Sequence, residues 1–223
     1  MPGIITKREL EQLVLAGENQ YLEFKRVVPE PSKLAKEMIA LANSGGGRIL
    51  IGVDDDGTIV GLKDSKEEVF AVATAATAHC VPEVSYQIDE LPISRKRDVL
   101  IVSISPSNTK PHFLVNGTTD GIRQAYLRVD DKSVKASREA VRVLRASTGE
   151  SEVRFEFGDK ELMLMRYLDQ YGRITVVEFA RLASIPKKTA SHTLVLMTRA
   201  NVLSIHHRES EDFFTLRRKK GSV

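Results

Sequence analysis

Residues that could support chemistry are concentrated between residues 18 and 62 of the chain. Glu23 and Lys25 lie two residues apart in a stretch where apolar and charged residues alternate, so a strand would place both on one face. Glu18 stands just before this stretch, between a predicted helix end and the strand start, where acidic groups can converge. On these patterns alone structural roles are favoured, with Glu18 capping a segment and Glu23 paired with Lys25.

The elements that would position these side chains follow from local sequence signals. Ser32 is the predicted N-cap of a helix with apolar residues at helical spacing, and the glycine-rich segment 43–48 is expected to end that helix. Residues 49–53 are a continuous apolar run typical of a buried strand, and Asp56-Gly57 predicts a hairpin turn after it. Backbone N–H groups of segment 43–48 could hold a phosphate. However, no Gly-Lys-Ser/Thr follows, so we interpret the segment as a turn and not as an ATP site.

Four segments form a combined pattern that is more specific than any one of them. They are Glu18-(four residues)-Glu23-Phe24-Lys25, Ala42-Asn43-Ser44-Gly45-Gly46-Gly47, Ile51-Gly52-Val53-Asp54-Asp55-Asp56-Gly57 and Tyr126-Leu127-Arg128-Val129. The pattern resembles the AlbA_2 domain of the Schlafen family and covers roughly residues 10–145. This resemblance implies an α/β domain of the mixed α+β kind.

The resemblance implies two different activities. Many bacterial and archaeal members are regarded as DNA-binding transcriptional regulators, whereas animal members include RNA endonucleases that cut tRNA and rRNA with three acidic residues. Carried over position by position, those acids are Glu18, Glu23 and Asp55. Gathered carboxylates stay ionised only with a cation between them, and their oxygens suit Mg²⁺ or Mn²⁺, which could activate the nucleophile. Lys25 would then neutralise the developing phosphate charge. In the structural alternative, Asp55 belongs to the hairpin turn, and no cofactor is expected.

Composition limits the class of protein. The chain has 223 residues, 42% of them hydrophobic and 28% charged, as in a soluble globular protein with room for two domains. No apolar run reaches the roughly 18 residues that a membrane helix needs, and the first residues lack an apolar signal core, so we expect a cytoplasmic protein. A lone Cys80 excludes an intrachain disulfide and is expected to be buried.

A boundary between two domains is predicted within the small, polar segment 146–152. We place the boundary so that residues 1–148 form the AlbA_2-like domain and residues 149–223 form a winged helix-turn-helix domain with a basic tail. The predicted elements after the boundary are a helix from Asp159, a short extended segment at 173–175, helices at 176–183 and 187–201, and a hairpin at 203–216.

The basic excess of the chain lies in this second part. Residues 1–150 contain 20 Lys and Arg against 21 Asp and Glu, whereas residues 151–223 contain 13 against 9, which would attract a polyanion. The third helix is expected to enter the major groove and to contact bases near its N-terminus. The candidate nucleic-acid contacts are Lys187, Lys188, Thr189, Ser191 and His192 on this helix, Arg208 on the hairpin, and Arg217 and Arg218 in the tail. The alternative is a winged helix used for dimerisation or protein contact.

Two functions follow from these observations. The first is a nucleic-acid-binding protein, a DNA-binding transcriptional regulator of the AlbA_2 type. The second is a metal-dependent endoribonuclease that cleaves tRNA or other structured RNA with Glu18, Glu23 and Asp55. Both predict a polyanionic partner, DNA or RNA, and no membrane. We also expect a homodimer, because animal Schlafen cores join two related lobes and this sequence has no internal repeat to supply a second.

Overall fold

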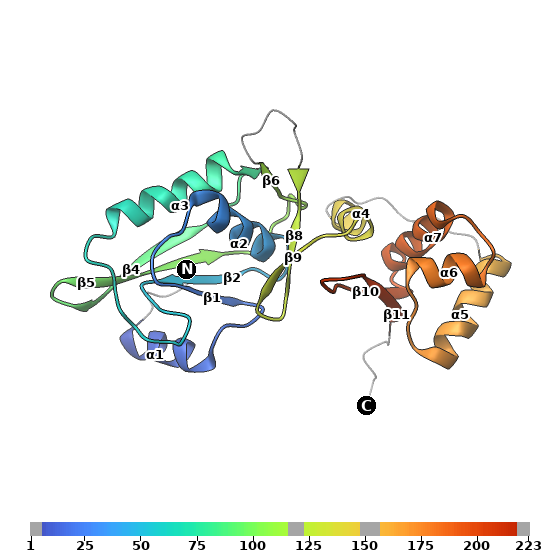
Figure 1. Cartoon of the computed structure of the whole chain (residues 1–223), viewed down its shortest axis with the longest axis horizontal. Coiled ribbons are helices and arrows are strands. Elements are labelled where there is room, and N and C mark those ends of the chain that lie inside the picture. The colour runs from blue at the N-terminus through green and yellow to red at the C-terminus, as the bar shows by residue number, and fades with distance from the viewer. Residues whose placement is uncertain (1–5, 116–122, 148–156, 218–223) are drawn as a thin grey trace. The chain divides into compact units, whose positions relative to one another are not determined.

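The computed structural model describes residues 6–115, 123–147 and 157–217. Its contacts divide the chain into two compact units, Met1–Lys135 and Ala136–Val223. The first unit combines helices with several sheets, and the second is a small domain of helices and one hairpin (Figure 1). The fold class predicted from the sequence, a mixed α+β domain followed by a small domain, is therefore confirmed.

A four-stranded sheet organises the first unit. Its strand order is β1 (Leu22–Lys25), β2 (Gly47–Ile51), β5 (Arg97–Ile104) and β4 (Gln87–Ser94). β1 runs parallel to β2, while β5 is antiparallel to both β2 and β4. The parallel pair requires a crossover, which the helix between β1 and β2 provides.

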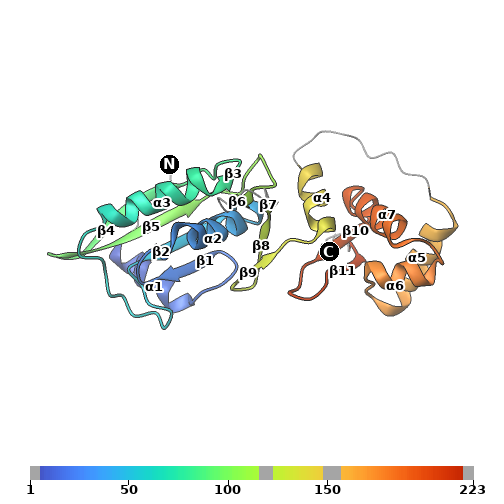
Figure 2. The ribbon, with the colours of Figure 1, turned by 45° about the horizontal axis from the view of Figure 1, so that its top comes forward.

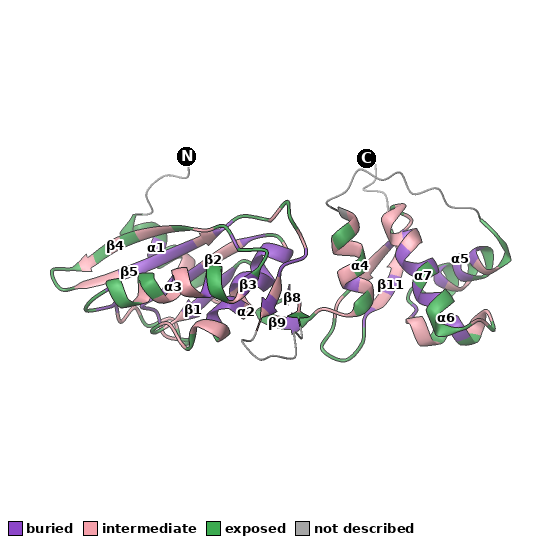
Figure 3. Ribbon diagram, turned by 90° about the horizontal axis from the view of Figure 1, so that it is seen from above, coloured by how far each residue is buried: buried purple, intermediate pink, exposed green. Residues whose placement is uncertain are grey.

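Helices cover both faces of this sheet. α2 (Pro31–Asn43) and α3 (Lys66–Ala78) lie on one face of the sheet and α1 (Lys7–Ala16) lies on the other (Figure 2). Apolar side chains of α2 and α3 pack with Ile49 and Val102, whereas Leu10 of α1 packs with Leu50 and Ile101. Successive side chains of a strand point to opposite faces, so a continuous apolar run is needed where both faces are covered. The buried side chains accordingly follow the sheet and the inward faces of its helices (Figure 3).

Shorter strands complete the first unit at the C-terminal end of α2. They are β3 (Cys80–Val81), β6 (Phe113–Val115) and β7 (Arg123–Gln124) in one sheet, and the hairpin of β8 (Tyr126–Val129) and β9 (Lys132–Lys135). The buried Asn43 side chain joins these segments to α2. Its Nδ2 donates to the carbonyls of His112 and Tyr126, each at 3.0 Å, and its Oδ1 accepts the His112 N–H at 2.8 Å. This amide therefore holds the β8–β9 hairpin against the helix.

The second unit begins with a helix that the sequence assigns to the first domain. Its elements are α4 (Arg138–Ser147), α5 (Asp159–Tyr171), α6 (Val176–Leu182), α7 (Lys187–Arg199), β10 (Leu203–His206) and β11 (Phe213–Leu216). Ile174 forms an antiparallel bridge with Phe214, and both side chains lie in the apolar core. Thr175 and Glu178 form a capping box at the start of α6.

The division between the units differs from the boundary placed between residues 148 and 149. The division lies between Lys135 and Ala136, because α4 belongs to the second unit. Ala140 of α4 is buried, Glu139 accepts a hydrogen bond from Ser191 of α7, and the Ser137 hydroxyl donates to Asp212. Residues 148–152 of the predicted linker lie outside the described residues.

Cys80 and the helices of the chain are the subject of two further predictions. Cys80 is buried as expected, and burial raises the pKa of its thiol to about 12. Among the residues that the structure describes, none of the helices combines the length and apolarity that crossing a bilayer requires.

Candidate functional site

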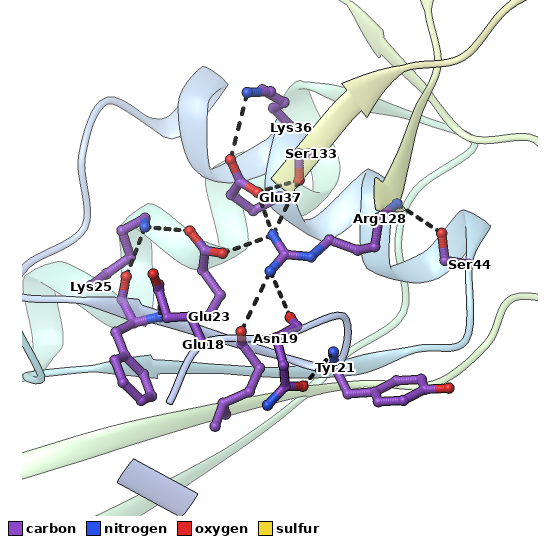
Figure 4. A network of polar contacts seen from close by, with 12 residues as sticks. Glu18, Asn19, Tyr21, Glu23, Lys25, Lys36, Glu37, Ser44, Arg128 and Ser133 are labelled. Carbon is purple, nitrogen blue, oxygen red and sulfur yellow. Dashed lines mark hydrogen bonds and ion pairs between the residues drawn. The ribbon is translucent and has the colours of Figure 1, made fainter. Parts of the chain in front are cut away.

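A buried ion pair between Arg128 and Glu23 belongs to a network of polar contacts in the first unit (Figure 4). The Arg128 Nη1 is 2.7 Å from the Glu23 Oε2, and the Arg128 side chain is only 1% exposed. β8 supplies the arginine and β1 supplies the glutamate, from positions 105 residues apart. Only the tertiary fold brings these two charges together.

Further groups surround the Arg128 guanidinium. Its Nη1 also lies 3.2 Å from the Oε2 of Glu37, a residue of α2 that accepts a hydrogen bond from the Ser133 hydroxyl. Its Nη2 donates to the carbonyl oxygens of Asn19 at 2.8 Å and Leu22 at 3.4 Å. The guanidinium is thus held by two carboxylates and by the backbone that leads into β1, although its Nε has no hydrogen-bond partner among the described residues.

The second oxygen of Glu23 is engaged by Lys25. The Lys25 Nζ donates to the Glu23 Oε1, and it also donates to the Phe24 carbonyl at 2.7 Å. The pairing of Glu23 with Lys25 on one face of the strand, expected in the structural alternative, is therefore confirmed. Both carboxylate oxygens of Glu23 carry a cationic partner.

Glu18 points toward the same strand but binds its backbone. Its Oε1 accepts the Phe24 N–H at 2.7 Å. Burial raises the pKa of Glu18 above its usual value, and the negative charges of Glu23 and Asp55 add to this shift. The Phe24 N–H and the Lys25 charge oppose it. The three acids thus influence one another electrostatically, but Glu18 is used as a backbone acceptor, as the structural alternative predicts.

Asp55 lies in the hairpin turn after β2 and is exposed. Its neighbours form the turn, since the Gly57 N–H donates to the Asp54 carbonyl at 2.8 Å and the Thr58 N–H donates to the Asp56 carboxylate at 2.8 Å. Arg26 pairs with the Asp54 carboxylate at 2.8 Å. The hairpin turn predicted at Asp56-Gly57 is thus present, with Asp55 at its tip.

These positions do not fit a resident metal ion. Across the described parts of the chain, no group of three or more His, Cys, Asp or Glu side chains is arranged to hold one. The Glu23 oxygens are occupied by Arg128 and Lys25, and the Glu18 Oε1 by a backbone N–H. A divalent cation at Glu18, Glu23 and Asp55 would have to displace these partners.

The second unit presents the other candidate residues on α7. Lys187, Lys188, Thr189 and His192 are exposed. Ser191 is only 6% exposed, because α4 packs over it. The Ser191 hydroxyl accepts from the Arg142 Nη1 at 3.1 Å and donates to Glu139, so its assignment as a nucleic-acid contact is corrected to a contact between helices.

The remaining predicted contacts lie near the hairpin. The Arg208 guanidinium is 4.7 Å from the centre of the Phe213 ring, and Arg217 donates to the side-chain oxygen of Asn201. Both arginines are exposed. Arg218 lies outside the described residues.

Sequence reasoning does not find three members of the buried network. Arg128 enters it only as part of the Tyr-Leu-Arg-Val segment, and an arginine inside an otherwise apolar strand is the signal that a buried partner exists. Glu37 and the Asn19 carbonyl carry no local signal, because their partner is distant in the sequence.

Comparisons with known proteins identify the first part of the chain. The family model described as Schlafen, AlbA_2 matches residues 18–137. A search of curated proteins found no match. The chain is similar to the DIP2311 protein from Corynebacterium diphtheriae, with 17% identity and a TM-score of 0.41, over 70% of this chain and 31% of that protein. It is also similar to the N-terminal domain of a DNA helicase RecG-related protein from Nitrosomonas europaea, with 20% identity and a TM-score of 0.40, over 70% of this chain and 96% of that domain.

The buried pair leads to a prediction about stability. Arg128→Met should lower the free energy of unfolding by about 3–5 kcal/mol, because it leaves buried carboxylate charge without its main partner. Arg26→Met is the matched control. It removes an arginine at a similar distance from a carboxylate, but the Arg26 side chain is 63% exposed, so we expect a loss of about 0–1 kcal/mol. Urea unfolding measures both variants, and equal losses would contradict a central role for Arg128.

The raised pKa of Glu18 predicts a pH dependence. A carboxyl whose pKa is higher in the folded than in the unfolded state stabilises the fold below its unfolded pKa and loses that contribution as pH rises through the folded value. Glu18→Gln keeps an acceptor for the Phe24 N–H but cannot ionise. Relative to this variant, the wild type should therefore lose stability from about pH 4 upward. Urea unfolding at several pH values measures the difference, and a constant difference would contradict the shift.

Proposed function

The chain belongs to the Schlafen AlbA_2 family, and from that premise we propose that it is a nucleic-acid-binding protein whose small C-terminal domain is a DNA-binding winged helix. The single observation that carries the proposal is the exposed basic start of α7. There Lys187 and Lys188 are followed by Thr189 and His192, all four accessible to a partner.

The element order of the second unit supports the winged-helix assignment. α6 and α7 are joined by a short turn, and Ser184 in that turn has a φ of 53°. The β10–β11 hairpin follows α7 directly. Ile174 forms an antiparallel bridge with Phe214 of β11 and so takes the position of a third short strand. In helix-turn-helix proteins the second helix lies in the major groove and its N-terminal residues contact base edges.

Electrostatics favour DNA over a protein partner. The N-terminus of a helix carries a partial positive charge, and Lys187 and Lys188 add to it, so this end of α7 attracts phosphate. Arg208 on the hairpin and Arg217 after it would contact the phosphate backbone on either side of the groove. A surface used only for protein contact has no need of this accumulation of positive charge.

We include a homodimer and a regulatory role in the proposal. A winged helix that recognises a two-fold symmetric operator uses one copy per half-site. Two-fold dimers are also the commonest assembly of soluble oligomers. The role of the AlbA_2 domain would then be to position two winged helices, and sedimentation equilibrium measures the assembly.

The DNA-binding proposal predicts the behaviour of a double variant. Lys187→Ala with Lys188→Ala should weaken duplex binding and lower the slope of log affinity against log salt by about 0.9 for each phosphate that is no longer neutralised. Fluorescence anisotropy with labelled duplex at several salt concentrations measures both quantities. Lys63→Ala with Lys66→Ala removes two exposed lysines from the first unit and should change neither. Equal effects of the two double variants would exclude α7 from the DNA-binding surface.

The endoribonuclease activity is tested separately. Incubation of the full chain with tRNA and Mn²⁺ should give no cleavage that depends on Glu23, because both oxygens of that carboxylate are engaged by protein cations. The comparison is between wild type and Glu23→Gln, with RNA fragments resolved by electrophoresis. Cleavage by wild type that disappears in Glu23→Gln, while the variant stays folded, would establish the nuclease instead.

A further inference from the structure

Helix α4 carries three arginines on one exposed face. Arg138, Arg142 and Arg145 are spaced by four and three residues, which places them above one another along the helix, and all three are exposed. Two of the described α4 side chains that lie between them in sequence, Ala140 and Val141, are buried or half-buried. We refer to Arg138, Arg142 and Arg145 as the arginine stripe.

The arginine stripe lies beside the basic end of α7. The Arg142 Nη1 is 3.1 Å from the Ser191 Oγ, and the same hydroxyl donates to Glu139, so α4 and α7 are in contact at this point (Figure 1). An α-helix turns by about 100° per residue, so Lys188 lies only about 60° around α7 from Ser191. His192 follows Ser191 directly in the sequence of α7 and is exposed. The exposed face of α7 therefore adjoins the arginine stripe.

The charge of this combined surface is mainly positive. Glu139 is the only acidic residue of α4, and its carboxylate accepts the Ser191 hydroxyl at the helix contact. α4 therefore carries three positive side chains and one negative side chain. α7 adds Lys187 and Lys188, and its first turn contains no acidic residue. A guanidinium binds phosphate oxygens through two parallel N–H groups, which makes arginine well suited to a nucleic-acid backbone.

We propose that the arginine stripe of α4 binds the phosphate backbone of the same duplex that α7 contacts. The inference rests on the proposed DNA-binding function of the second unit and extends its interface to a helix outside the helix-turn-helix. In this arrangement α7 lies in the major groove, while α4 lies along one of the two strands that border it. The sequence boundary at residue 148 would separate these two helices, whereas the structure holds both in one unit.

The test removes one charge at a time from the full chain. Arg138→Gln and Arg145→Gln keep the polarity of the side chain and leave the Arg142–Ser191 hydrogen bond intact. Each should lower the salt slope by about 0.9, so that the loss of affinity between 50 and 200 mM salt shrinks by about threefold per variant and about tenfold in the double variant. Arg166→Gln removes an exposed arginine from α5 in the same unit and should leave both quantities unchanged.

The outcomes separate this inference from the proposed function. If Lys187→Ala with Lys188→Ala lowers the slope while the α4 variants behave like Arg166→Gln, the arginine stripe is only a solvated helix face and the inference fails. If wild type binds no duplex, the proposed function fails and takes the inference with it. A loss of affinity with an unchanged slope and a lower melting temperature would assign the stripe to folding, and this too would overturn the inference.

Discussion

The structure of the first unit depends on the neutralisation of one buried positive charge. The Arg128 guanidinium is almost fully removed from solvent, and an isolated charge in that position would cost more free energy than the whole net stability of a typical domain. Glu23 and Glu37 supply the opposite charge, and two carbonyl oxygens supply the remaining acceptors. These partners come from β1, α2 and the loop before β1, so the docking of the hairpin that carries Arg128 joins all three segments. Lys25 forms an ion pair with the second carboxylate oxygen of Glu23.

Local patterns predict most of the regular elements of the chain. The strand that carries Glu23 and Lys25, the helix that ends at segment 43–48 and the strand expected from the apolar run at 49–53 all depend on neighbouring residues, and β1, α2 and β2 lie at these places. The predicted cap of the helix is wrong, because α2 begins at Pro31 after Glu30, so Ser32 lies inside the helix. Strands of two or three residues, such as β3, β6 and β7, give no such signal, because their pairing depends on partners far along the chain. Sequence separation decides which ion pair of Glu23 can be predicted: the pair with Lys25 can, and the pair with Arg128 cannot. One is local, whereas the other spans 105 residues.

The position of α4 shows a second limit of local reasoning. The polar segment at 146–152 is a reasonable linker by composition, but composition says nothing about the surface against which the preceding helix packs. α4 has its buried residue Ala140 and its contacts with Ser191 in the second unit. Sequence reasoning therefore places Ser191 on the solvent face of α7, whereas it belongs to a helix contact. A helix between two domains can be assigned only when the contacts of both of its faces are known.

The engagement of both Glu23 oxygens also restricts how this part of the chain can change in evolution. Replacement of Arg128 alone leaves Glu23 with Lys25 but without its buried partner, and replacement of Glu23 alone leaves the guanidinium with Glu37 as its remaining carboxylate among the described residues, so either single step lowers stability. Joint replacement by apolar residues of similar volume would avoid that penalty, because buried ion pairs are often no more stabilising than well-packed apolar groups. Positions 23 and 128 should therefore vary together in descendants of this sequence. A lineage that carries the ion pair tends to keep it, because each single replacement lowers the stability of the fold.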